Sequence, residues 1–248
     1  MAINYLYGEN ESGQPEPSSF DGISDEDLER HLDKSRYGTF ELTDAVRPSY
    51  DLRVTPREGY RHDEYEDEED KSKVPVLMIA ASRENLFELF MDLIEPIGLE
   101  VDVVLETSHR NRHHADLYRE HIDMSVLQSW LWDHQDLLEN DGFTGIAVLN
   151  PDVPTEVQFD EHKLLIAYGH NLEPYEEILN RHGIPLDEKI KFITEAEHVH
   201  SSSDAYERDF DELRTKIGLD CHVIGKNEEW RGEGGGDEDY DDGGSLSL

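Results

Sequence analysis

The chain has 248 residues, of which 36% are hydrophobic, and its 59 acidic and 22 basic side chains give a formal net charge of −37. This excess of negative charge argues against DNA, RNA or an anionic membrane as a direct partner and favours a protein partner, for which basic residues would complement the charge. Because the apolar residues gather in the middle of the chain, we predict one folded domain at 74–225, between a mostly disordered acidic arm at 1–73 and a disordered, acidic, Gly-rich tail at 226–248.

The acidity itself has two explanations at this point. It is typical of proteins adapted to a salty cytosol, where ions screen the repulsion between like charges, and it is equally compatible with a surface kept for a basic partner. The single cysteine, Cys221, cannot form an intramolecular disulfide, and we expect a buried thiol. The chain shows neither a signal-peptide pattern nor an apolar run long enough to span a bilayer, so we expect a cytoplasmic protein.

The predicted elements alternate between strands and helices. Within the arm, Ser24 is placed to cap a short helix that continues to about Arg36. In the folded region, the residue pattern predicts a strand at 74–81, a helix from Ser82 to Gly98 and a strand at 99–107. A polar loop or helix start at 108–114 comes next. It is followed by a helical pattern towards Asn140, with a new start near Asp123, and by a strand at 145–149. It continues with a hairpin at 157–168, a helix at 171–183, a strand at 190–199, a helix from 201 to Gly218 and an edge strand at 219–224.

Two strand–helix–strand stretches, starting at Leu77 and Leu164, have similar apolar spacing. They suggest two βαβ-type units with a hairpin and an inserted helix between them. We therefore predict an α/β (α+β) fold, a mixed-sheet α/β sandwich, with a ferredoxin-like arrangement as one form that it could take. Architecture of this kind does not determine a function.

The motifs of the commonest enzymes are missing from the sequence, which contains neither a P-loop, nor a dinucleotide-binding GxGxxG after a strand, nor a GxSxG nucleophile elbow. Histidine density is the most unusual feature. Imidazole nitrogens bind Zn²⁺ and related ions, and one such candidate set follows the strand at 99–107, while a second lies on one side of a strand end. These candidate metal ligands are His109, His113 and His114, and His198 and His200.

Two further features have simple structural interpretations. Glu156, Asp160, Glu161 and His162 surround the predicted hairpin and could supply an acid–base pair, but in so acidic a chain their adjacency is expected by chance. Trp130 falls on the apolar face of its predicted helix, whereas Trp132 falls away from it and is a candidate anchor for a protein partner.

From the sequence we therefore expect a non-enzymatic cytoplasmic regulatory or adaptor domain that binds a protein partner and needs no cofactor. Two alternatives stay open. The first is a metal-dependent enzyme, with a transition metal such as zinc on the histidines. The second is a small-molecule sensor with a groove between the two βαβ-type units.

Overall fold

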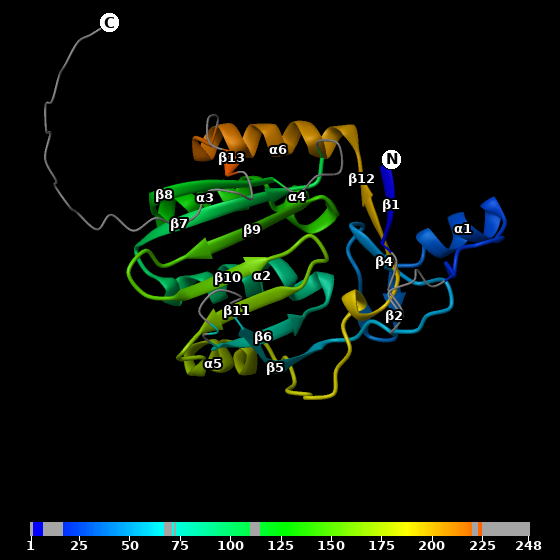
Figure 1. Cartoon of the computed structure of the whole chain (residues 1–248), viewed down its shortest axis with the longest axis horizontal. Coiled ribbons are helices and arrows are strands. Elements are labelled where there is room, and N and C mark those ends of the chain that lie inside the picture. The colour runs from blue at the N-terminus through cyan, green and yellow to red at the C-terminus, as the bar shows by residue number, and fades with distance from the viewer. Residues whose placement is uncertain are drawn as a thin grey trace, which may run out of the picture.

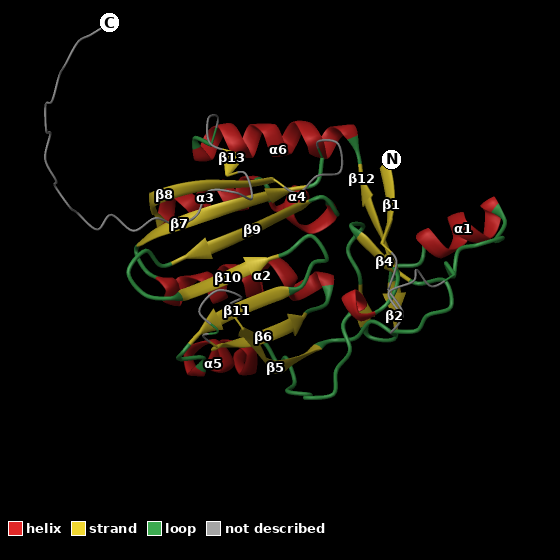
Figure 2. Ribbon diagram, viewed as in Figure 1, coloured by secondary structure: helices red, strands yellow, loops and turns green. Residues whose placement is uncertain are grey.

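A computed structural model describes residues 2–6, 17–66, 71, 73–109, 115–219 and 223–224, with only the backbone described at 2–6 and 223–224. These segments form an α+β fold (Figures 1 and 2), which confirms the predicted class. Their helices are α1 (Asp25–Leu32), α2 (Arg83–Ile94), α3 (Met124–Asp133), α4 (Gln135–Asn140), α5 (Glu173–Arg181) and α6 (Asp204–Ile217), with short 3₁₀ turns η1 (Glu95–Ile97) and η2 (Ile193–Glu195).

The larger of two main sheets has eight strands in the described part of the chain, in the order β13-β8-β7-β9-β10-β11-β6-β5, and every neighbouring pair is antiparallel. A parallel contact is made by an isolated bridge between Tyr60 and Leu186. The strands are β5 (Gly59–Glu66), β6 (Lys73–Ala80), β7 (Glu100–Thr107), β8 (Ala115–Asp123), β9 (Thr144–Leu149), β10 (Thr155–Phe159), β11 (Leu165–Gly169) and β13 (Val223–Ile224).

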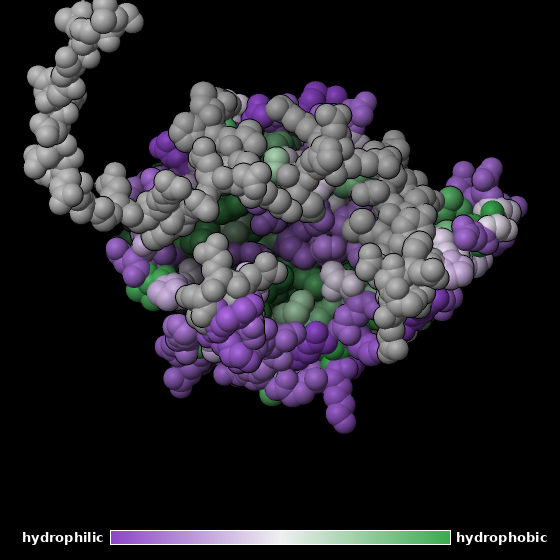
Figure 3. Space-filling view, viewed as in Figure 1, coloured by the Kyte–Doolittle hydropathy of each residue, from purple (hydrophilic) through white to green (hydrophobic). Residues whose placement is uncertain are grey.

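The main core lies between the helices and one face of this sheet, and α2 and α5 are seen behind the strands in Figure 1. In β11 the alternation is clear, because Leu165 and Ala167 are fully buried in the core while Ile166 and Tyr168 are half-buried on the other face. Figure 3 views that other face, where apolar side chains lie in a hollow among hydrophilic ones. The sheet therefore has one face covered by helices and one mixed face, as antiparallel sheets commonly do.

The smaller main sheet lies beside the larger one and has the order β1-β12-β4 (Figure 1). It joins segments that are far apart in sequence, because β12 pairs antiparallel with β1 on one side and with β4 on the other. Its strands are β1 (Ala2–Leu6), β4 (Val46–Pro48) and β12 (His198–Ser202), and a separate two-stranded ribbon is formed by β2 (Arg36–Tyr37) and β3 (Phe40–Glu41).

Residues 17–66 differ from the prediction of a mostly disordered arm. The predicted helix is present as α1, where Ser24 accepts a hydrogen bond from the Asp27 amide. Few apolar residues occur in this segment, but Tyr37, Phe40 and Tyr60 are all buried. Strand β5 lies at the edge of the large sheet, where most of its side chains are exposed to solvent and can be polar. The polar composition of this segment therefore suggested disorder.

The helix predicted over residues 115–123 is wrong, since this segment is β8. Its two inward side chains, Leu117 and Ile122, are five positions apart, whereas a regular strand would place inward residues an even number apart. A bulge against Val101 and Val103 of β7 supplies the extra residue, and His121 has a left-handed φ of 56°. This irregularity hides the strand periodicity in the sequence.

The two similar strand–helix–strand stretches have different surroundings in the structure. β6 and β7 belong to the same sheet, but β9, β10 and β11 lie between them. The strand that follows α5 does not belong to the large sheet: the segment predicted as a strand at 190–199 contains the turn η2 and leads into β12 of the small sheet. A ferredoxin-like arrangement remains a prediction only.

None of the helices in the described segments is both long and apolar enough to cross a bilayer.

Candidate metal centre

His198 and His200 are brought to one side of β12 by the alternation of a strand, as the sequence predicted. Both side chains are buried, with exposed fractions of 6% and 1%. Their ring centroids lie 5.1 Å apart. β12 thus offers two imidazoles at the interior of the molecule.

The third imidazole comes from His162, in the tight turn that joins β10 to β11. Asp160 shapes this turn, because its Oδ1 accepts the backbone N–H groups of His162 (3.0 Å) and Leu164 (2.8 Å). Lys163 completes the turn with a left-handed φ of 63°. The predicted hairpin is confirmed, and its tip points towards the small sheet.

The three rings form a compact cluster where the two sheets meet. The His162 ring lies edge to face against both others, with centroids 5.0 Å from His198 and 4.8 Å from His200. One ring nitrogen of each histidine lies within 4.8 Å of those of the other two. A tetrahedral Zn²⁺ with bonds of about 2.0–2.1 Å holds its nitrogens roughly 3.3 Å apart, so shifts on the order of 1 Å would complete the set.

The hydrogen bonds determine which nitrogen each ring offers. Nδ1 of His198 lies 2.8 Å from the Ala196 carbonyl oxygen, and Nδ1 of His200 lies 2.6 Å from that of Gly142. Nδ1 of His162 lies 2.8 Å from Oδ2 of Asp160. Since these oxygens only accept, each Nδ1 carries a proton, and Nε2 is the nitrogen of each ring that can bind a metal.

The lone pairs on Nε2 of His198 and His200 have no hydrogen-bond partner among the described residues, although both atoms are buried. An unsatisfied buried polar atom costs about 1–3 kcal/mol, and a bound metal ion would remove that penalty. Rings that donate from Nδ1 to a carbonyl or carboxylate while Nε2 is free are also the usual arrangement of histidine metal ligands.

Burial keeps two of the rings neutral, which is the form that binds metals. It lowers the pKa of His198 to about 4 and the pKa of His200 to about 3. For His162 burial acts in the same direction, but the Asp160 carboxylate outweighs it and the pKa is raised. The pKa of Asp160 is lowered, because His162 overcomes the opposing effect of burial, so this carboxylate stays ionised and orients the ring.

The neighbouring side chains hold the hairpin tip in place. The buried Lys163 Nζ donates to the Thr144 carbonyl of β9 at 2.8 Å, and burial lowers the pKa of Lys163 to about 8. At the start of β12, Glu197 accepts from the Ser18 hydroxyl at 2.5 Å and from the Ser19 amide at 2.7 Å. The two sides of the cluster are therefore fixed by separate contacts.

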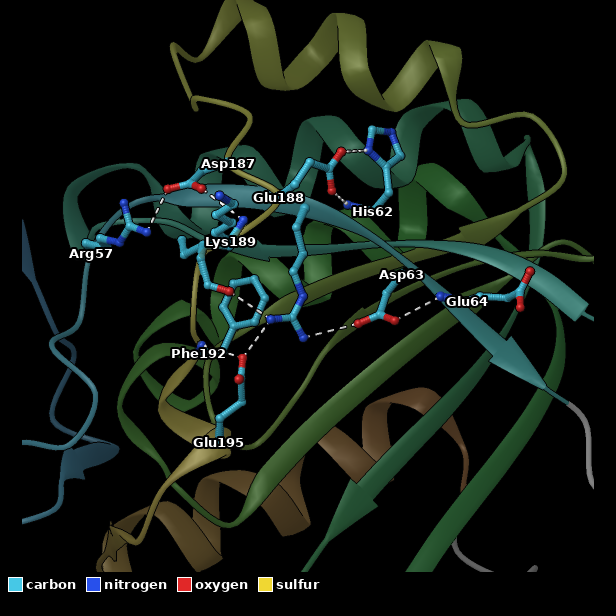
Figure 4. A network of polar contacts seen from close by, with 11 residues as sticks. Arg57, His62, Asp63, Glu64, Asp187, Glu188, Lys189, Phe192 and Glu195 are labelled. Carbon is cyan, nitrogen blue, oxygen red and sulfur yellow. Dashed lines mark hydrogen bonds and ion pairs between the residues drawn. The ribbon is translucent and has the colours of Figure 1, made fainter.

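A polar network fastens the segment that leads into β12 (Figure 4). Arg61 of β5 donates to the Ile190 carbonyl and to Glu195, both at 2.7 Å, and packs over the Phe192 ring. His62 faces Glu188 at 2.7 Å. Through these contacts β5 of the large sheet sets the position from which the small-sheet strand starts.

His109, another predicted ligand, is not part of the cluster. His109 Nε2 lies 2.7 Å from Oδ2 of the buried Asp141, and its ring packs against Phe143 and Phe210. His113 and His114 lie outside the described residues, as do Cys221 and the tail at 226–248. Sequence reasoning thus selected two of the three clustered histidines, and assigned the third, His162, only to an acid–base pair.

Trp132, the predicted partner anchor, is 51% exposed. Its ring stands edge to face on Phe87 of α2, with centroids 4.9 Å apart. Trp130 packs against the main core, as predicted.

Comparisons of the chain with protein-family models, with curated proteins and with solved structures find no match.

Proposed function

We propose that this protein binds a transition metal ion, Zn²⁺ in the first place, through Nε2 of His162, His198 and His200. One observation carries the proposal. The buried Nε2 atoms of the neutral rings of His198 and His200 have no hydrogen-bond partner among the described residues, and they lie near the ring of His162, whose Nδ1 is held by a carboxylate. Neutral imidazole is a donor for zinc, copper, iron and nickel, and zinc usually takes four ligands in a tetrahedral arrangement.

The number of ligands favours a centre with chemistry over a purely structural one. The three nitrogens that the described residues supply leave the fourth tetrahedral position to water or to a further ligand, as in catalytic zinc sites, whereas structural sites are closed by four protein ligands. Zinc lowers the pKa of a bound water to about 7, so the centre could serve a hydrolytic reaction. Asp160 would then act as a positioning residue, since it touches the His162 ring and orients it.

Metal analysis of untagged protein purified without chelators tests the proposal. We expect about one zinc per chain in the natural protein, and loss of that ion in His162→Asn, His198→Asn and His200→Asn. An asparagine amide can still donate where Nδ1 did, so these variants remove the ligand while keeping that hydrogen bond. The matched control is His170→Asn, at an exposed histidine outside the cluster. Absence of stoichiometric metal, or metal that survives all three substitutions, contradicts the proposal.

A second proposal concerns a protein partner, as in a regulatory or adaptor domain, and rests on Trp132. Exposed tryptophans are enriched among the residues that dominate binding energy at interfaces, and Phe87 already fixes this ring. The acidic chain favours a partner with basic residues. A pull-down with the natural protein and with Trp132→Ala should lose the specific partner in the variant, while exchange of the exposed Leu99 for alanine should leave it bound.

A further inference from the structure

A groove of about 480 Å³ lies on the helix-free face of the large sheet, at the end of the β10–β11 hairpin opposite to the histidine cluster. Its size is within the range of small-molecule sites. The strand register explains how its walls come together, because Leu149, Glu156 and Tyr168 are direct cross-strand neighbours on β9, β10 and β11. Residues that pair directly point to the same face of a sheet.

Two tyrosines form a corner of this groove. Tyr65 of β5 and Tyr168 of β11 have ring centroids 6.2 Å apart and an interplanar angle of 86°, so their ring planes are almost perpendicular. Tyr65 is 50% exposed. Aromatic faces attract cations through their quadrupole, and alkylated ammonium groups are the ligands that such corners recognise.

A carboxyl group stands beside the aromatic corner and is held in position. The Gln158 amide donates to Glu156, while the Tyr168 hydroxyl lies 3.4 Å from the Gln158 oxygen. Burial raises the pKa of Glu156, which means that its charged form lacks solvation. Burial and the nearby Glu156 also raise the pKa of Tyr168, so its hydroxyl stays protonated. A cation beside Glu156 would stabilise the carboxylate, because it would attract the negative charge and would make a contact in place of the missing water.

The rest of the lining combines apolar residues with the polar Asn150 and Thr155, and the lining among the described residues contains neither lysine nor arginine. Val74 and Leu149 are half-buried there and offer a surface for alkyl groups. Over longer distances the net charge of −37 draws cations to the molecule.

We propose that this groove binds a small organic cation, an alkylated ammonium compound, with the ammonium against Tyr65, Tyr168 and the Glu156 carboxylate and the alkyl part against Val74 and Leu149. The site is separate from the histidine cluster, so it requires no metal ion. It would make the protein a receptor for such a compound.

Calorimetric titration of the full chain with choline, and with tetramethylammonium as a second probe, tests this at constant ionic strength. We expect saturable binding of one choline per chain, and binding of 3,3-dimethyl-1-butanol, the uncharged isostere, at least about tenfold weaker. Equal affinity for the isostere would overturn the proposal, because the groove would then select shape and not charge. Failure of both cations to bind would overturn it as well.

Variants separate the groove from general attraction to an acidic surface. Tyr65→Leu keeps an apolar side chain but removes the aromatic face, and Glu156→Gln removes the charge; each should weaken choline at least about tenfold. Tyr50→Leu, at another exposed tyrosine, and Glu100→Gln, at an exposed carboxylate, should leave the affinity unchanged. Thermal unfolding of each variant shows that it is folded. Equal losses in the control pair and the groove pair would overturn the proposal, since choline would then be held by the surface charge as a whole.

Discussion

The ring of His162, at the tip of the β10–β11 hairpin, meets the ring of His200, on β12 of the other sheet, at an interplanar angle of 87° with centroids 4.8 Å apart. A metal ion bound between them would link the large sheet to the small one. Binding to the folded state alone stabilises a protein by about 2.7 kcal/mol when the free ligand is at 100 times its dissociation constant.

We therefore expect zinc to raise the midpoint of thermal unfolding, and a chelator to reverse the rise. In His162→Asn the rise should be absent, because the hairpin tip no longer supplies a ligand. Calorimetric scans with zinc, with calcium and with chelator measure this. Equal stabilisation by calcium, which prefers oxygen ligands, would indicate that the ions act on the acidic surface and not on the histidines.

Acid should destabilise the metal-free protein through the buried rings. The folded-state pKa values of His198 and His200, about 4 and about 3, lie below the value of about 6.5 for an unfolded chain. Between these values the unfolded state binds more protons, so stability is present above pH 6.5 and is lost as the pH falls.

Urea unfolding of chelator-treated protein at pH 7 and at pH 5 measures this loss. In His200→Asn, which cannot take up that proton, the loss should be smaller than in the natural protein. The carboxylates titrate in both proteins, so the difference between the two isolates the ring. If both proteins lost the same stability between pH 7 and pH 5, the His200 ring would take up its proton as readily in the folded state as in the unfolded state.

Removal of residues 1–71 should strongly lower the midpoint of unfolding. The deletion takes away β5, which pairs with β6 along all eight residues, together with the buried ring of Tyr60 and the network of Arg61. Removal of 226–248, a segment with few apolar residues, serves as the comparison, and we expect it to leave the midpoint nearly unchanged. A cooperative transition at the natural midpoint in the 72–248 chain would contradict the role of β5.

Gly142 should not tolerate a side chain. A Cβ there would lie 2.5 Å from the Ala45 carbonyl oxygen and 2.9 Å from that of Ser201, both of them backbone atoms. Gly142→Ala is expected to destabilise the protein by about 1–3 kcal/mol and to weaken zinc binding, because the Gly142 carbonyl orients His200. Gly169→Ala, where the nearest atom is a side-chain oxygen at 3.3 Å, is the control for denaturant unfolding.

Local patterns in the sequence were sufficient for several elements of the central region. The alternation of His198 and His200 placed both on one side of a strand, and the apolar runs of β6 and α2 were readable without knowledge of their partners. His162 could not be assigned to them, because it lies 36 positions before His198 and only the packing of two sheets brings them together. Polar edge strands such as β5, and the bulge in β8, left no regular period to read.

The position of β5 at one edge of the large sheet has a consequence for how the protein behaves at high concentration. Edge strands are templates on which a second chain can add its own strand, and many proteins block this with charged side chains. The second half of β5 carries Asp63, Glu64 and Glu66, so an approaching copy of the same strand would meet carboxylates of like charge. The acidic residues that made this segment look unstructured thus protect the sheet against edge-to-edge aggregation.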